Sequence, residues 1–128
     1  MISLLLDSQA LLWAMDGSKH LGKTARALLK AQNDPVGISV ASVWELAIKH
    51  ARGGIDLPDD FVDKIAEAGF QILPTSPGLF WRAGHLPRHH GDPFDRLIIA
   101  QALDMALAVM TSDAIFPSYG IKVVDASR

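Results

Sequence analysis

The sequence of 128 residues predicts a three-layer α/β/α fold built on a short, mainly parallel five-stranded sheet. Three observations predict it: short apolar segments recur along the chain, helical patterns separate them, and the apolar segments show no regular polar alternation. Strands that are apolar throughout are buried on both faces. Strand–helix–strand order with right-handed crossovers then favours a mainly parallel sheet between two helical layers.

The apolar segments and the helical patterns follow one another from one end of the chain to the other. We expect strands at residues 2–6, 36–40, 70–73, 106–111 and 121–124. We expect helices near residues 8–15, 22–32, 42–52, 59–68, 77–85 and 92–105. No repeat, linker or low-complexity tract divides them, so we expect a single domain over residues 1–128.

Composition excludes several classes of function. The absence of cysteine excludes disulfides, thiolate chemistry and cysteine-based zinc sites, and it suits a cytoplasmic protein. The N-terminal run "MISLLLDSQALLWAMDG" meets Asp7 long before the ~20 apolar residues that a membrane span requires, so we expect no membrane association. A net charge of −2 argues against nucleic-acid binding by a bulk positive field. Any such binding must be local.

Acidic residues follow the predicted strands. Asp7 comes directly after the first strand, Glu45 lies just past the second at the start of its helix, and Asp113 follows the fourth. Asp95 opens the helix that leads into the fourth strand. Because ligands of open parallel sheets bind outside the carboxyl ends of the strands, these four carboxylates are expected to converge on one crevice.

Each carboxylate also has an explanation as a helix or turn cap. Asp7 can begin the following helix, Ser42 and Glu45 form an S-x-x-E capping box, and Asp113 can cap a turn before Pro117. Taken singly, these explanations are as good as a chemical one. The joint pattern at the strand ends favours chemistry.

The stretch "HGDPFDRLIIAQAL", residues 90–103, places two aspartates at one helix start. Asp92 fits an N-cap, with Pro93 at the first helical position. Asp95 instead continues the stripe of Ile98 and Ile99 that the helix must bury. We therefore expect Asp92 mainly to cap the helix and Asp95 to face the crevice.

Clustered carboxylates need a counter-charge. Two of them about 4 Å apart repel by about 4 kcal/mol at an effective dielectric constant of about 20, which raises their pKa values. Mg²⁺ or Mn²⁺ would remove this conflict, because hard cations prefer oxygen ligands. Such a cation can also turn a bound water into a nucleophile for a phosphodiester.

Four segments, in order, resemble the PIN domain family, and within it the VapC-like toxins of bacterial type II toxin–antitoxin pairs. They are "LLLDSQALLWAM", "ISVASVWELAIKHARGGIDLP", "HGDPFDRLIIAQAL" and "MTSDAIFPSYGIKVV", and together they cover essentially the whole chain. The resemblance implies a PIN-like fold and an endoribonuclease that depends on Mg²⁺ or Mn²⁺. It also implies an RNA substrate, a cognate antitoxin as partner, and a homodimer.

The resemblance also implies roles for the acidic residues. Asp7 and Asp95 would be the principal metal ligands, Glu45 would bind metal or position water, and Asp113 would complete the site. Many relatives carry Thr-His after the first aspartate, where this chain has Ser8 and Gln9. Ser8 can still supply a hydroxyl, whereas Gln9 leaves a histidine role unfilled. The residues that we expect to position ligands or substrate are Ser8, Asp92 and Thr111.

Other polar and aromatic residues carry weaker signals. The candidate contacts for RNA phosphate are Lys49, Arg52, Arg88 and Arg96, although helix surfaces carry such charges anyway. We expect the histidines of "GHLPRHHGD", which are His85, His89 and His90, to lie in a solvated loop, or else to touch phosphate near the crevice. We expect core or rim packing for Trp13, Trp44, Phe80 and Trp81, the first two on helices that by resemblance border an antitoxin groove.

Two other functions compete with the ribonuclease. Two specific classes are excluded first. A haloacid-dehalogenase-type phosphatase would need a second aspartate two residues after Asp7, where Gln9 stands. A phosphoacceptor receiver domain would need an aspartate where the third strand ends at Leu73. Another metal-dependent phosphohydrolase remains an alternative. A non-catalytic PIN-like RNA-binding module is the other, although such a module gains nothing from carboxylates aimed at phosphate.

Overall fold

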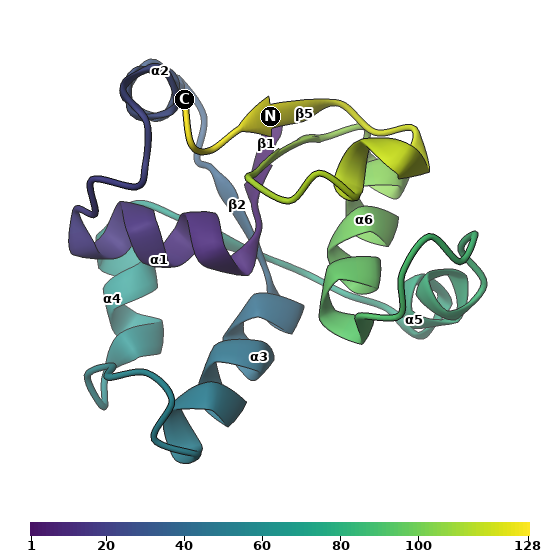
Figure 1. Cartoon of the computed structure of the whole chain (residues 1–128), viewed down its shortest axis with the longest axis horizontal. Coiled ribbons are helices and arrows are strands. Elements are labelled where there is room, and N and C mark those ends of the chain that lie inside the picture. The colour runs from purple at the N-terminus through teal and green to yellow at the C-terminus, as the bar shows by residue number, and fades with distance from the viewer.

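A computed structural model of residues 1–128 confirms the α/β fold and its five-stranded sheet (Figure 1). The strands are β1 Leu4–Leu6, β2 Gly37–Ser39, β3 Gln71–Leu73, β4 Ala108–Thr111 and β5 Val123–Asp125. The helices are α1 Ser8–Asp16, α2 Lys23–Lys30, α3 Val40–Ala51, α4 Phe61–Glu67, α5 Pro77–Gly84 and α6 Pro93–Met105. Every predicted element is present, and the sequence analysis missed one, the 3₁₀ helix η1 Phe116–Tyr119.

The sheet is parallel throughout, with the strand order β3-β2-β1-β4-β5. The chain runs outward from central β1 through β2 to β3 and then returns to the other side of β1 for β4 and β5. Leu6 pairs with Ile38 on one side and with Met110 on the other. The next residue of each strand therefore lies at a single edge of the sheet, next to the point where the strand order reverses. Open sheets bind ligands at such a point.

Apolar residues cover both faces of the sheet. In β1, Leu5 joins a cluster built mainly from α5 and α6, whereas Leu4 and Leu6 join a second cluster under the other helices. Figure 1 shows the corresponding layers, with α1 and α4 on one side of β1 and β2, and α5 and α6 on the other. Burial on both faces explains why the strands show no polar alternation.

Helix α3 begins two residues before its predicted start, and this excludes the proposed capping box of Ser42 and Glu45. The N-cap is Ser39, the last residue of β2, whose Oγ accepts the backbone N–H of Ala41 at 3.1 Å. The strand thus enters the helix with no loop between them. Glu45 consequently lies inside the helix, where its carboxylate is free for other contacts.

The start of α6 matches the prediction. Asp92 is the N-cap, and its Oδ1 accepts the backbone N–H groups of Phe94 at 2.9 Å and Asp95 at 3.0 Å. Pro93 is the first helical residue, where no backbone donor is required. Asp95 follows in the first turn.

Substitution of Asp92 tests this cap. Both Asp92→Ser and Asp92→Ala remove a charge next to Asp95, but only serine keeps an oxygen that can accept the N–H groups. The free energy of unfolding of the metal-free protein should therefore be about 1 kcal/mol lower for the alanine variant than for the serine variant. Urea denaturation measures the difference, and equal stabilities would contradict the assignment of Asp92 as the cap.

Candidate functional site

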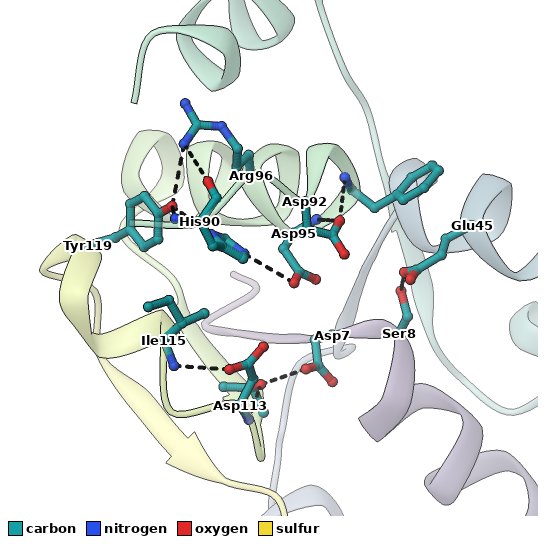
Figure 2. A network of polar contacts seen from close by, with 12 residues as sticks. Asp7, Ser8, Glu45, His90, Asp92, Asp95, Arg96, Asp113, Ile115 and Tyr119 are labelled. Atoms are coloured by element: carbon teal, nitrogen blue, oxygen red, sulfur yellow. Dashed lines mark hydrogen bonds and ion pairs between the residues drawn. The ribbon is translucent and has the colours of Figure 1, made fainter. Parts of the chain in front are cut away.

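A small acidic cleft lies at the carboxyl edge of β1 and β4, with a volume of about 170 Å³. Its lining includes five carboxylates and one lysine. The lining residues are Asp7, Ser8, Gln9, Leu12, Glu45, Leu46, Lys49, Asp92, Asp95, Ser112 and Asp113. The four acids that the sequence analysis expected to converge therefore do meet at one crevice. Figure 2 shows the carboxylates of Asp7, Asp95 and Asp113 around a common space, with Glu45 beside Ser8.

Asp7 both caps a helix and lines the cleft. Its Oδ1 accepts the backbone N–H of Ala10 at 2.8 Å, which caps α1, and its Oδ2 accepts the hydroxyl of Thr111 at 2.5 Å. The pairing of Leu6 with Met110 explains the second bond, because it places the residues that follow these two side by side. The capping explanation for Asp7 is thus correct, and it does not compete with a place in the cleft.

Burial raises the pKa values of two of these acids. The pKa of Asp95 rises to about 7, first because the side chain is buried and then through the charge of Asp92, while a hydrogen bond from His90 opposes the rise. The pKa of Asp7 also rises through burial, against the hydrogen bonds from Thr111 and Ala10. Charges on the other acids add to both shifts. Loss of hydration therefore contributes more than the mutual repulsion that the sequence analysis stressed.

Glu45 is held between α1 and α3. Its Oε1 accepts the hydroxyl of Ser8 at 2.5 Å, and Ser8 Oγ lies 2.9 Å from Ser42 Oγ. The other carboxylate oxygen of Glu45, Oε2, lies 3.3 Å from Nζ of Lys49, one helical turn further along α3. The hydroxyl of Ser8 thus holds one carboxylate oxygen of Glu45 by a hydrogen bond.

Thr111 joins two of the acids. Besides donating to Asp7, its hydroxyl accepts the backbone N–H of Asp113 at 3.0 Å. Asp113 also accepts the backbone N–H of Ile115 at 3.0 Å through Oδ1, so it does cap a turn before Pro117. The side chain of Asp113 nevertheless stands at the cleft (Figure 2).

The donor set of the cleft fits a hard divalent cation, since most of the polar side chains in its lining are carboxylates and hydroxyls. No three His, Cys, Asp or Glu side chains are gathered closely enough to form a ready coordination shell. Mg²⁺ typically takes only one or two carboxylates and keeps several waters. The cleft therefore suits a hydrated cation in its chemistry and offers no dense cage of protein ligands.

The basic residues do not all lie where the sequence analysis placed them. Lys49 lines the cleft and is half exposed. Arg52 is exposed just after α3, and Arg88 is exposed at a different groove, so neither of them lines the cleft. Among the four candidate phosphate contacts, only Lys49 stands beside the carboxylates.

The interpretation of Arg96 as an RNA contact is wrong, because the side chain is only 7% exposed. Its guanidinium donates to carbonyl oxygens of the preceding loop, at 2.8 Å to Leu86 and 3.0 Å to Pro87, with longer bonds to Gly84 and His90. Five donors in a rigid fork suit this task. Arg96 thus ties the loop between α5 and α6 to the first turn of α6.

One histidine departs from the expected solvated loop. His85 and His89 are exposed, but His90 is half-buried, with Nε2 3.3 Å from Asp95 Oδ2 and Nδ1 2.7 Å from the hydroxyl of Tyr119. The only indication of this contact in the sequence is that His90 lies two residues before Asp92, the N-cap of α6. The other half of the contact comes from η1, which was not predicted.

A larger apolar groove of about 480 Å³ lies between α3, α5 and the start of α6. Trp44 is 62% exposed and Phe80 52% exposed at this groove, and Trp44 meets Phe94 edge-on, with ring centroids 5.3 Å apart. Trp81 is also exposed, and Trp13 is half-buried against His20. The expectation for these aromatic residues is packing in the core or at its rim. Trp44 and Phe80 line the rim of this groove, and Trp44, Phe80 and Trp81 all lie outside the core.

The helices are all too short, or not apolar enough, to cross a membrane.

Comparison with known proteins places this arrangement in a family. The PIN domain family model matches residues 4–122. Similar solved structures include VapBC2 from Rickettsia felis bound to a promoter DNA fragment, with 16% identity, a TM-score of 0.70, and coverage of 97% of this chain and 98% of that chain. A toxin–antitoxin complex from Klebsiella pneumoniae matches with 20% identity, a TM-score of 0.69 and the same coverage. VapBC-1 from nontypeable Haemophilus influenzae matches over 100% of both chains, with 18% identity and a TM-score of 0.64.

At these identities the structural similarities show the fold alone, and no curated protein matches the chain significantly. The family model, however, spans nearly the whole sequence, including all five acids of the cleft. The chain belongs to the PIN domain family.

Proposed function

We propose that the protein is a metal-dependent endoribonuclease and the toxin of a toxin–antitoxin pair, acting in the cytoplasm. The observation that carries this proposal is the cleft in which Asp7, Glu45, Asp95 and Asp113 meet at the carboxyl edge of the sheet. Structures of toxin–antitoxin complexes share the fold, which supports the second half of the proposal. The alternative of a non-catalytic RNA-binding module is less well supported, because an acidic cleft without a cation repels phosphate.

The residues of the cleft divide the work between them. Asp7 and Asp95 would be the principal ligands of Mg²⁺ or Mn²⁺, and Asp113 would complete the site. When bound, such a cation neutralises charge on the phosphate and makes a water more acidic. In hydrolysis the water oxygen bonds to phosphorus, the bond to the leaving sugar oxygen breaks, and a proton passes to that oxygen. Glu45, which is held by Ser8 and Lys49, would orient this water.

RNA cleavage should require Mg²⁺ or Mn²⁺ and should fall to background in the variant Asp95→Asn. Asparagine keeps the volume and an oxygen that can accept a hydrogen bond from His90, but it removes the charge that binds the cation. The measurement is digestion of single-stranded RNA with mapping of the new ends, alongside melting curves that report the fold.

Asp104→Asn is the matched control, because Asp104 lies on the same helix but pairs with Arg82 away from the cleft. This variant should cleave RNA like the wild type. Cleavage that persists undiminished in excess chelator, or near wild-type activity of Asp95→Asn, would show that the proposed chemistry is wrong.

The metal-free protein should become less stable as the pH rises from about 4 to about 7. Over this interval the folded protein still holds a proton on Asp95 that the unfolded chain has released, so the free energy of unfolding falls with pH. The total loss should be roughly a few kcal/mol. Urea denaturation at several pH values measures it.

The Asp95→Asn variant should show a shallower fall, and saturating Mn²⁺ should remove most of it, because a bound cation favours the ionised carboxylate. Asp104→Asn should keep the full slope. Stability of the metal-free wild type that rises over the same interval would contradict the buried, uncompensated state of Asp95.

We also propose that the apolar groove is the homodimer interface. Exposed tryptophan and phenylalanine side chains gathered on one face are typical of protein–protein contacts, and a two-fold dimer can pair such a face with itself. Trp44 precedes Glu45 and Phe94 precedes Asp95, so the groove and the cleft share helices α3 and α6. We propose further that a basic side chain of the antitoxin enters the acidic cleft.

Substitution of Trp44 tests the dimer. The wild type should sediment as a dimer, whereas Trp44→Lys should sediment as a monomer with little loss of melting temperature, because the side chain is mostly exposed. Val62→Lys, at an exposed apolar position on α4, is the control and should remain dimeric. A monomeric wild type, or a dimeric Trp44→Lys, would exclude this interface.

A further inference from the structure

We propose that His90 is a positioning residue, whose imidazole donates from Nε2 to Asp95 and holds that carboxylate in the orientation that binds the cation. The inference rests on the proposed metal-dependent function, and it deepens that function by assigning a side chain that the sequence analysis left in a solvated loop. Its basis is the hydrogen-bond network that joins α6, η1 and the loop between α5 and α6 (Figure 2).

The imidazole of His90 bridges two parts of the molecule. On one side, Nε2 lies 3.3 Å from Oδ2 of Asp95, and on the other, Nδ1 lies 2.7 Å from the hydroxyl of Tyr119. Tyr119 is buried at the end of η1, far from Asp95 in the sequence. Both ring nitrogens therefore have a polar neighbour, and the ring is held from two directions.

The donors around Tyr119 decide which ring nitrogen carries the proton. Its hydroxyl oxygen faces an N–H of Arg96 at 3.4 Å and the backbone N–H of His90 at 3.3 Å, and both of these groups can only donate. The oxygen has two lone pairs for them, and its single proton is left for the shortest contact, to Nδ1 of His90. Nδ1 is then an acceptor, and the ring proton lies on Nε2, directed at the carboxylate.

The backbone of His90 is also held in place. Arg96 donates to the carbonyl oxygen of His90 and to those of Leu86 and Pro87 from inside the protein. Arg96 and His90 thus both contact the hydroxyl of Tyr119, and Arg96 also holds the loop that carries His90. This buried anchor keeps the imidazole from turning away from Asp95.

The contact leaves the rest of the carboxylate free. Asp95 Oδ2 contacts the imidazole of His90, no hydrogen bond within the protein engages Oδ1, and the residue lines the cleft. A side chain that orients a metal ligand in this way typically changes metal affinity or activity by about 10- to 100-fold when it is replaced. His90 should therefore contribute to cation binding without contacting the cation or the RNA.

Paired substitutions of the full chain separate the two ring nitrogens. Asparagine places its amide near the position of Nδ1 and loses the donor to Asp95, whereas glutamine places an amide N–H near the position of Nε2 and keeps it. We expect calorimetric titration with Mn²⁺ alone to show about 10- to 100-fold weaker binding for His90→Asn. His90→Gln should bind within a few-fold of the wild type.

His85→Gln is the matched control, because His85 belongs to the same stretch but contacts Trp81 rather than the cleft. Its Mn²⁺ affinity should be unchanged. Wild-type affinity of His90→Asn would overturn the proposal, and so would equal weakening of the asparagine and glutamine variants when melting curves show both to be folded.

A spectroscopic measurement tests the tautomer independently. In ¹⁵N-labelled, metal-free protein above about pH 7, where Asp95 is ionised, the two-bond ¹⁵N–¹H correlations of His90 should show a protonated Nε2 and an unprotonated Nδ1. The opposite tautomer would overturn the proposal, because Nε2 could not then donate to Asp95.

Asp95→Asn in the same titration distinguishes this proposal from the one on which it rests. If Asp95→Asn abolishes Mn²⁺ binding while His90→Asn retains wild-type affinity, the metal site stands and the role of His90 is wrong. If Asp95→Asn binds Mn²⁺ like the wild type, the metal site itself has been misplaced.

Discussion

The parallel pairing of β1 with β4 is the constraint on which the acidic cleft depends. It sets Leu6 beside Met110, and so places Asp7 beside Thr111, whose hydroxyl bonds the carboxylate across a sequence separation of 104 residues. Because β1 is also the central strand, the same edge receives α1 and α3 from one side and α6 from the other. A shift of one residue in this register would move the side chains of one strand to the opposite face of the sheet and separate Asp7 from Thr111.

Several polar groups of the cleft perform structural work as well. Asp7 caps α1, Asp92 caps α6, and Asp113 holds the turn that leads into η1. These bonds satisfy backbone donors that would otherwise lack a partner, and they offset part of the cost of burying charge. Asp95 lacks this compensation: it accepts only from His90, which leaves its pKa far above the ordinary value. The free-energy cost of burying the ionised carboxylate is therefore poorly offset at Asp95, which we propose as a principal ligand.

The sequence predicted the strands, the helices and the convergence of the acids because all three follow from local patterns. Apolar runs predict buried strands, and residues that follow parallel strands must share an edge. The positions of His90, Arg96 and Trp44 could not be predicted in this way. Arg96 follows Asp95 by one residue, about 100° around the helix, and only the packing of the preceding loop decides whether that direction is solvent or protein. The contact of His90 requires Tyr119, which lies on an element that has no strong sequence signal.

The loop between α5 and α6 connects the two cavities of the molecule. Arg88 and Gly91 line the apolar groove, while His90, between them, contacts Asp95 at the acidic cleft. Arg96 holds this loop from within and itself borders the groove. The same short segment and the same buried guanidinium therefore contribute to the groove and to the contact of Asp95 with His90. Because His90 lies between two residues that line the groove, a change in the conformation of this loop at the groove should also alter the hydrogen bond that Asp95 receives.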